Sequence, residues 1–255
     1  MADIDALSDE LDIPWEKMKD IPFSTSVPFI GFLWDLDTCT VSLSDRRKEK
    51  YLQAILDWEV KPRHTLEEVQ KLYGKLLHVC HILPSGCAYL TSLESFMAQF
   101  HNHPFCPHSS PCRTAGNLQW WKSRLIQPML ARPIPSPAPL IDASDYSDAS
   151  SETGIGIMVG DKWHAWQLLP GWKANGRDIG WAEAVSFLLL TITLSPTIPK
   201  GSHVKVFRNN RGVVEGWWKG RSRNKPTNDV FRDIHALTEK EGILSTLNMF
   251  QAKRT

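Results

Sequence analysis

The chain has 255 residues, of which 42% are hydrophobic and 22% are charged, and its formal net charge is +1 at pH 7. This length suits one large domain or two modest ones, and the composition is ordinary for a protein that buries a core. The near-neutral charge excludes a global electrostatic field for a polyanion, so any nucleic-acid contact requires a local basic patch.

The N-terminus, MADIDALSDE, is acidic, whereas a signal peptide needs a basic start and then an apolar stretch. The longest apolar run, Ala184 to Leu194, is far shorter than the roughly 20 residues of a membrane span. We therefore expect an intracellular protein, cytoplasmic or nuclear and not secreted, with its five cysteines reduced and no membrane partner.

The first half of the chain favours a short hairpin followed by helices. Residues 1–28 are polar and predict a loose lead-in. Phe29 to Leu43 predicts two short strands around a turn, because aromatic and β-branched residues dominate it. Apolar residues at helical spacing follow Ser44, the expected N-cap, and again follow Thr65, where Thr-Leu-Glu-Glu fits a capping box.

Two more helices are expected, from about Gly86 to Phe100 and from Leu118 to Leu130. The following string, RPIPSPAP at 132–139, predicts a semi-rigid linker because proline lacks the N–H that a helix or a central strand requires. We place the domain boundary there, between an N-terminal domain at 1–131 and a C-terminal domain at 140–255.

Beyond the linker, strand and helix patterns alternate. The expected order is strand, strand, helix, strand, helix, helix, which describes a mixed α/β domain. The last helix is expected to start at a cap on Thr227 or Asn228. The segments, in chain order, are 153–160, 162–169, 180–194, 203–207, 211–220 and 226–242.

Three positions in the C-terminal half have the chemistry of a two-metal site. Asp148 lies where a strand ends against a serine-rich turn, Glu183 is an acid within an apolar helix, and Asn209 follows a strand. Oxygen ligands from strand ends and a nearby helix can hold two Mg²⁺ ions about 4 Å apart, which activate a water and stabilise a leaving oxygen. Taken alone, the same pattern also fits a turn aspartate and a surface glutamate.

Several long strings resemble the reverse transcriptase/ribonuclease H region of DIRS-type retrotransposons, whose elements carry a tyrosine recombinase. In the C-terminal half they are SDASSETGIGIMVGDKWHAWQLLPGW, GRDIGWAEAV and KVFRNNRGVVEGWWKGRSRNKPTN. Upstream they are FIGFLWDLDTCTVSL, KYLQAILDW, GKLLHVCHILPSGCAYLTSLESF and LQWW. The resemblance covers about Trp15 to His235. It implies an α/β (α+β) fold, in which a hairpin and thumb- or connection-like helices precede a ribonuclease H-like mixed-sheet domain.

The resemblance implies roles for the candidate ligands. The first metal-binding aspartate falls on Asp148, with Asp142 as the alternative, and the helix glutamate falls on Glu183. The third ligand falls on Asn209, where the family has an aspartate, and a further acid lies in a segment that we expect to be missing. An amide in place of a carboxylate removes a negative charge that faces two dications. We therefore expect a weakened two-ion Mg²⁺ site and impaired catalysis.

A basic stretch led by two tryptophans follows the last candidate ligand. Arginine and lysine neutralise phosphates, and an exposed tryptophan stacks on a base. The alternative is that both tryptophans face the core and that the cations form a solvated cap. The resemblance implies an RNA–DNA hybrid as the partner. The predicted nucleic-acid-binding residues are Trp217, Trp218, Lys219, Arg221, Arg223 and Lys225.

Three functions stay open at this point. The leading one is a retroelement-derived fragment, catalytically impaired, that binds an RNA–DNA hybrid or another nucleic acid. The second is an active Mg²⁺-dependent ribonuclease H that uses Asp148 and Glu183 and tolerates Asn209. The third is a decayed open reading frame without a selected role. No Tyr-x-Asp-Asp string occurs, so we expect no polymerase activity from this chain, and a separate polymerase segment is a candidate partner.

Overall fold

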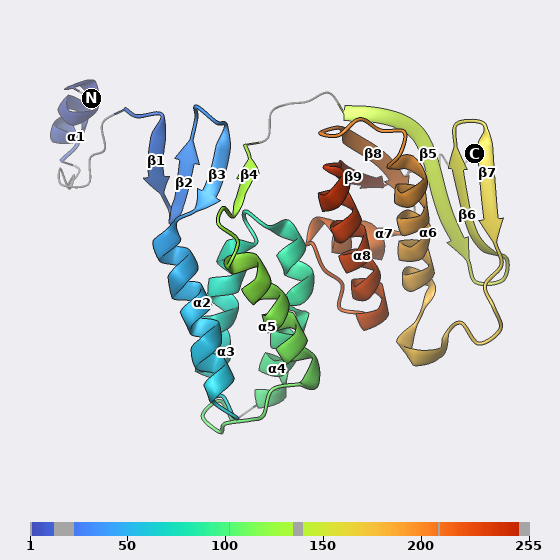
Figure 1. The fold of residues 1–255 in the computed structure, drawn as a ribbon, viewed down its shortest axis with the longest axis horizontal. Coiled ribbons are helices and arrows are strands. Elements are labelled where there is room, and N and C mark those ends of the chain that lie inside the picture. Colours follow the sequence, from blue (N-terminus) through green and yellow to red (C-terminus); the bar gives the residue numbers. More distant parts are fainter. Residues whose placement is uncertain (1, 13–22, 102, 135–139, 209, 250–255) are drawn as a thin grey trace.

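Figure 1 shows two sheet-and-helix halves that lie side by side. The computed structural model describes residues 2–12, 23–101, 103–134, 140–208 and 210–249. No helix in these ranges is both long enough and apolar enough to cross a membrane.

The N-terminal sheet is antiparallel and has the strand order β1-β2-β3-β4. Its strands are β1 (Ser26–Phe29), β2 (Phe32–Asp35), β3 (Thr40–Leu43) and β4 (Ala131–Pro133). The β2–β3 hairpin confirms the predicted pair of strands. The prediction that residues 1–28 form a loose lead-in is wrong in part, because α1 (Ala2–Glu10) and most of β1 lie there.

The turn between β1 and β2 explains why β1 was missed. Ile30 and Gly31 have φ values of 52° and 83°, as in a two-residue hairpin turn that requires positive φ at both central positions. Asparagine or glycine normally occupies the first of these positions, and a β-branched isoleucine is a rare choice. The usual sequence signal of such a hairpin is therefore absent.

Helices pack beneath this sheet. They are α2 (Asp45–Val60), α3 (Leu66–Val79), η2 (Pro84–Tyr89), α4 (Thr91–Met97), η3 (Ala98–Phe100) and α5 (Cys112–Leu125). The helix expected at 86–100 is divided into three pieces, and α5 both begins and ends earlier than expected. Because α5 ends at Leu125, Leu130 lies outside the helix, next to the N-terminal sheet. The carbonyl of Leu130 accepts a hydrogen bond from Leu43 N at 3.0 Å.

The predicted capping box at Thr65 is confirmed. Its hydroxyl accepts from Glu68 N at 3.4 Å, and Thr65 N donates to the Glu68 carboxylate at 3.0 Å. Ser44 occupies the N-cap position of α2 as predicted, but its side chain makes no capping hydrogen bond.

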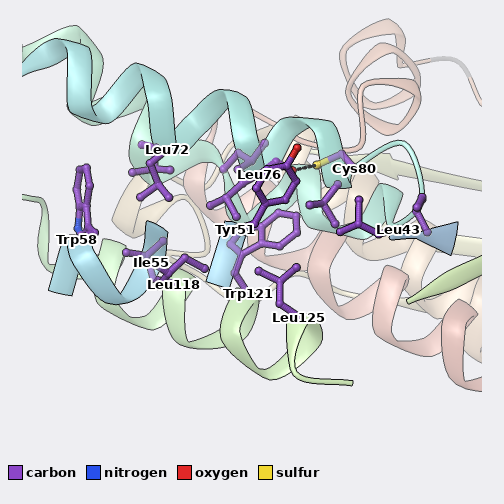
Figure 2. Close-up of a cluster of buried hydrophobic side chains, with 14 of the residues drawn as sticks. Leu43, Tyr51, Ile55, Trp58, Leu72, Leu76, Cys80, Leu118, Trp121 and Leu125 are labelled. Carbon is purple, nitrogen blue, oxygen red and sulfur yellow. Dashed lines mark hydrogen bonds between the residues drawn. The ribbon is translucent and has the colours of Figure 1, made fainter. Parts of the chain in front are cut away.

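The first hydrophobic core lies between α2, α3 and α5, whose side chains converge in Figure 2. Ile55 of α2, Leu76 of α3 and Trp121 of α5 are all 0% exposed. Gly86 lies against the ring of Trp121, so close that a Cβ at residue 86 would be 2.2 Å from the ring. This close approach accounts for a glycine in η2.

The C-terminal sheet is mixed and has the order β7-β6-β5-β8-β9. Its strands are β5 (Leu140–Ser150), β6 (Gly154–Val159), β7 (Lys162–Trp166), β8 (His203–Arg208) and β9 (Leu244–Met249). β5, β6 and β7 pair antiparallel, whereas β8 is parallel to both β5 and β9. The strands at 153–160, 162–169 and 203–207 were predicted, and β9 was not.

α6 (Ile179–Leu194), α7 (Arg211–Trp218) and α8 (Lys225–Glu241) pack on one face of this sheet and form a second core with it. The prediction that Thr227 or Asn228 caps α8 is wrong. The cap is Asn224, whose Oδ1 accepts from Thr227 N at 3.0 Å. Pro226 does not delay the helix, because its missing N–H falls in the first turn, where no intrahelical acceptor exists.

The predicted linker at 132–139 begins inside β4, an edge strand that tolerates Pro133. Residues 135–139 lie outside the described part of the chain. The two hydrophobic cores share no residue, and hydrogen bonds and ion pairs connect the halves. The mixed α/β architecture agrees with the expected fold class.

Candidate functional site

The predicted metal ligands Asp148 and Glu183 lie on β5 and α6. Glu183 is 4% exposed, whereas Asp148 is exposed. Ser147 pairs with Ile157, a residue of the core under α6, and Asp148 pairs with Gly156. Because neighbouring side chains of a strand point to opposite faces, Asp148 points to the face of the sheet away from α6. Strand alternation therefore does not bring these two carboxylates onto one face.

The other two candidates give no further support. Asn209 lies outside the described residues. Asp142 pairs with Lys205 in the parallel β5–β8 ladder, and its side chain is likewise outside the described part. Among the described residues, no group of three or more His, Cys, Asp or Glu is placed to hold a metal ion. The cluster of Asp148, Glu183 and Asn209 stays a prediction.

Asp145 is a buried acid that the sequence reasoning missed. It is 2% exposed, and its Oδ1 accepts from Gly160 N at 3.2 Å. It shares the strand parity of Ser147 and so lies on the helix-covered face with Glu183. The sequence does contain a signal for this burial. Asp145 and Asp148 are three residues apart on one strand, so their side chains point to opposite faces of the sheet. The bond to Gly160 indicates that Asp145 holds the β6–β7 turn.

The open face around Asp148 is hollowed. A cavity of about 550 Å³ is lined by Asp148, Gly154, Gly156 and Trp166, among others. Gly156 leaves room there, because a Cβ at this residue would meet nothing within 4 Å. Among the described residues that line the cavity, Asp148 is the only one with a carboxylate. A single carboxylate supplies too little negative charge to hold two dications.

The two tryptophans of the predicted nucleic-acid surface differ in exposure. Trp217 stacks on His235 with ring centroids 4.4 Å apart and meets Phe187 edge-on, so it belongs to the second core. Trp218 is 63% exposed. The core-facing alternative therefore holds for Trp217, and Trp218 is the tryptophan placed to stack on a base.

Three of the four cations of this stretch line a cleft of about 950 Å³ between the α7–α8 segment and α4. Lys219, Arg221 and Arg223 contribute to its wall. Lys219 lies 3.7 Å from Glu215, a weak pairing. Arg223 and Lys225 are exposed, and no carboxylate of the described residues forms an ion pair with either.

Arg221 instead connects the two halves. It pairs with Glu94 at 2.6 Å and donates to the hydroxyl of Tyr73 at 3.4 Å. Burial and the hydrogen bond to Glu94 raise the pKa of Tyr73 to about 12. A hydrogen bond with Cys80 lowers the pKa of Cys87, and Arg221 lowers it further. Arg221 is thus committed to protein groups.

A second polar contact holds α8 against the N-terminal half. The carbonyl of Ala88 accepts from Asn228 Nδ2 at 2.8 Å and from Arg232 Nη2 at 2.9 Å. Arg232 also donates to Asn117 at 3.0 Å and lies over the ring of Tyr89 at 4.3 Å. These contacts fix the position of the α7–α8 segment, and with it the cleft.

No model of a protein family, no curated protein and no solved structure matches the chain. The resemblance to the retrotransposon region therefore stays a prediction that rests on the sequence strings quoted above.

Proposed function

We propose that the chain is a fragment derived from the reverse transcriptase/ribonuclease H region of a retroelement polyprotein and that it retains nucleic-acid binding but little cleavage activity. The strand order and directions of the C-terminal sheet give the main support: antiparallel β7-β6-β5 continues into parallel β5-β8-β9. α6 lies between β7 and β8 in the chain and packs on β5 and β6. A mixed sheet with a long helix at this position is what the resemblance implies.

The proposal of impaired cleavage rests on the acids. Glu183 is buried on α6, Asp148 is exposed on the opposite face of the sheet, and residue 209 is an amide. A two-metal mechanism needs anionic ligands that converge on both ions. The chain offers fewer such charges at these positions than the resembling family.

The proposal of nucleic-acid binding rests on the exposed part of the α7–α8 segment. Trp218 offers a ring for stacking, and Lys219, Arg223 and Lys225 offer positive charge beside the cleft. Such groups bind the phosphate backbone and bases without reading sequence. We therefore assign this surface to an RNA–DNA hybrid or a single strand.

Fluorescence anisotropy with labelled hybrid, single-stranded RNA and duplex DNA tests the binding. We expect the double variant Arg223→Ala/Lys225→Ala to weaken hybrid binding about ten-fold and to reduce the salt slope by about 1 to 2, because two phosphate contacts are lost. The matched control is Arg46→Ala/Lys71→Ala, which removes the same charge from exposed positions on α2 and α3. Equal losses in both double variants would reject this surface.

Cleavage is tested separately, with labelled RNA in a hybrid and millimolar Mg²⁺. We expect no hybrid-specific cleavage by the unmodified chain. Brisk cleavage that Glu183→Gln abolishes would refute the impaired reading and favour the active ribonuclease H.

A further inference from the structure

β7 is an edge strand of the C-terminal sheet, and both of its faces are exposed. It stands at one end of the strand order β7-β6-β5-β8-β9 and at the outer side of the molecule in Figure 1. α6 packs on β5 and β6, and all five residues of β7 are exposed, with Trp163 at 73% and Trp166 at 42%. Within the described part of the chain, no strand pairs with the outer edge of β7.

This edge lacks the features that usually keep an edge strand from pairing with another chain. Such features are a proline, a bulge or a charge at the centre of the strand. The pairing of β7 with β6 is continuous, and Lys162 at the start of β7 is its one permanently charged side chain. β1, an edge strand of the N-terminal sheet, carries Pro28 by contrast. β7 is therefore open to a further strand.

The two-residue turn at 160–161 decides which backbone groups of β7 point outward. Lys162 follows this turn and so belongs to the first hydrogen-bonded pair of the β6–β7 hairpin. Bonded and non-bonded pairs alternate along an antiparallel ladder, so His164 also bonds to β6. The backbone N–H and C=O groups of Trp163 and Ala165 therefore point away from β6, toward the open edge.

An antiparallel second copy of β7, centred on His164, matches these groups. In that register Trp163 of one copy lies opposite Ala165 of the other, and the two residues exchange both backbone hydrogen bonds. The two-fold symmetry repeats the pair. On the other face of the sheet Lys162 lies opposite Trp166, which favours a cation–π contact across the strands.

The open face of the sheet offers a hollow in line with a projecting ring. Ala165 pairs with Gly156, and Gly156 pairs with Asp148, so these residues form one row. The row lines the cavity of about 550 Å³, where a Cβ at Gly156 would meet nothing within 4 Å. Asp148 and Ala165 are exposed, so the cavity opens to solvent. In the register centred on His164, the row continues into Trp163 of the second copy, whose exposed indole reaches over Ala165 toward Gly156.

We propose that two copies of this chain pair through β7 as a two-fold dimer, in which Trp163 of each copy occupies the cavity beside Gly156 of the other. A second copy fits because the ring, the hollow and the outward backbone groups all lie on one self-complementary surface. A pair of five-residue strands is small beside the roughly 1,200–2,000 Å² of a standard interface, so we expect a weak dimer. This surface is separate from the nucleic-acid surface proposed above.

Sedimentation equilibrium of the full chain, at about 1 µM to 1 mM, measures the association. We expect a monomer–dimer equilibrium. Ala165→Pro should weaken it about ten-fold or more, because proline removes an outward N–H from each copy and no bond to β6. Ser26→Pro, two residues from Pro28 on the edge strand β1, is the matched control and should leave it unchanged. A monomer throughout this range would overturn the proposal, and the edge would then fit a strand of another protein.

The indole has its own variant. Trp163→Ala keeps the outward backbone groups and removes the ring, so it should weaken dimerisation about ten-fold or more. Trp218→Ala is the matched control, because Trp218 is likewise exposed, at 63%, and lies outside the C-terminal sheet. Unchanged association of Trp163→Ala would contradict the placement of its ring in the cavity.

Cross-linking tests the register even if Ala165→Pro does not fold. Residues of a non-hydrogen-bonded pair have Cα atoms about 4.5 Å apart, within the range of a disulfide. His164→Cys should therefore form a disulfide-linked dimer with oxidised glutathione. Lys162→Cys is the matched control on the same face, about 14 Å from its own copy in this register, and should link no more than the unmodified chain. No linkage through His164→Cys, or equal linkage in both variants, would overturn the proposal.

Discussion

Arg232→Met should loosen the contact between the halves. The Arg232 guanidinium on α8 donates to the carbonyl of Ala88 at 3.2 and 2.9 Å and to Asn117 at 3.0 Å, and it lies over Tyr89. Methionine keeps most of the apolar stem and removes the donors and the charge. The two hydrophobic cores stay intact, because neither includes Arg232.

The magnitude follows from the groups lost. Hydrogen bonds to a charged group contribute about 1.5–3 kcal/mol each, and a cation–π contact of this kind about 1 kcal/mol. Desolvation offsets part of this sum, since burial lowers the pKa of Arg232. Ala88 O keeps Asn228 as a donor, so no buried carbonyl is orphaned there. We expect a net loss of about 3 kcal/mol from the contact between the halves.

Calorimetry and urea unfolding monitored by tryptophan fluorescence measure this effect. We expect Arg232→Met to separate one cooperative transition into two, and to accelerate proteolysis between residues 134 and 140. Arg63→Met, at an exposed position between α2 and α3, is the control. A variant that unfolds in one transition at the wild-type midpoint would refute the reasoning.

Further outcomes follow from individual positions. Gly86→Ala should destabilise the chain by about 1–3 kcal/mol in urea unfolding, because its Cβ would lie 2.2 Å from the buried ring of Trp121. Burial lowers the pKa of His235 from 6.5 to about 4. The unfolded chain therefore takes up the proton first, and stability should fall by on the order of 3 kcal/mol as the pH drops from 6.5 to 4. His235→Phe should flatten this dependence, and an unchanged slope would contradict it. Asn209→Asp should tighten Mg²⁺ binding in calorimetric titration, because it adds a negative charge to the candidate ligand set; equal affinities would count against a metal site there.

Local patterns of the sequence predicted much of the secondary structure. The capping box at Thr65, the apolar helix that became α6 and the strand pattern around Gly154 and Gly156 all depend on neighbouring residues. A cap bond or a run of apolar residues operates over one or two turns, so a single sequence contains it.

Contacts between distant segments decided the rest. The sequence placed Asp148 at a strand end, but the pairing of β5 with β6 decided which face it occupies. A register shift in the β5–β8 ladder between Asp142 and Tyr146 also interrupts the alternation of side chains between the two faces of β5, so the sequence alone does not show which face each aspartate occupies. Trp217 and Trp218 are adjacent and chemically equal in the sequence, yet only the packing of α7 places the first partly buried against the second core and leaves the second exposed.

The cleft that Arg223 lines also depends on contacts between segments that are far apart in the sequence. Arg232 and Ala88 are 144 residues apart in the chain, and no periodic pattern links a guanidinium to one backbone carbonyl at that separation. The sequence by itself predicted much of the secondary structure and supplied the candidate acids and cations. Only tertiary packing decided which of these charges face solvent and which hold the halves together, because burial depends on contacts that local patterns do not contain.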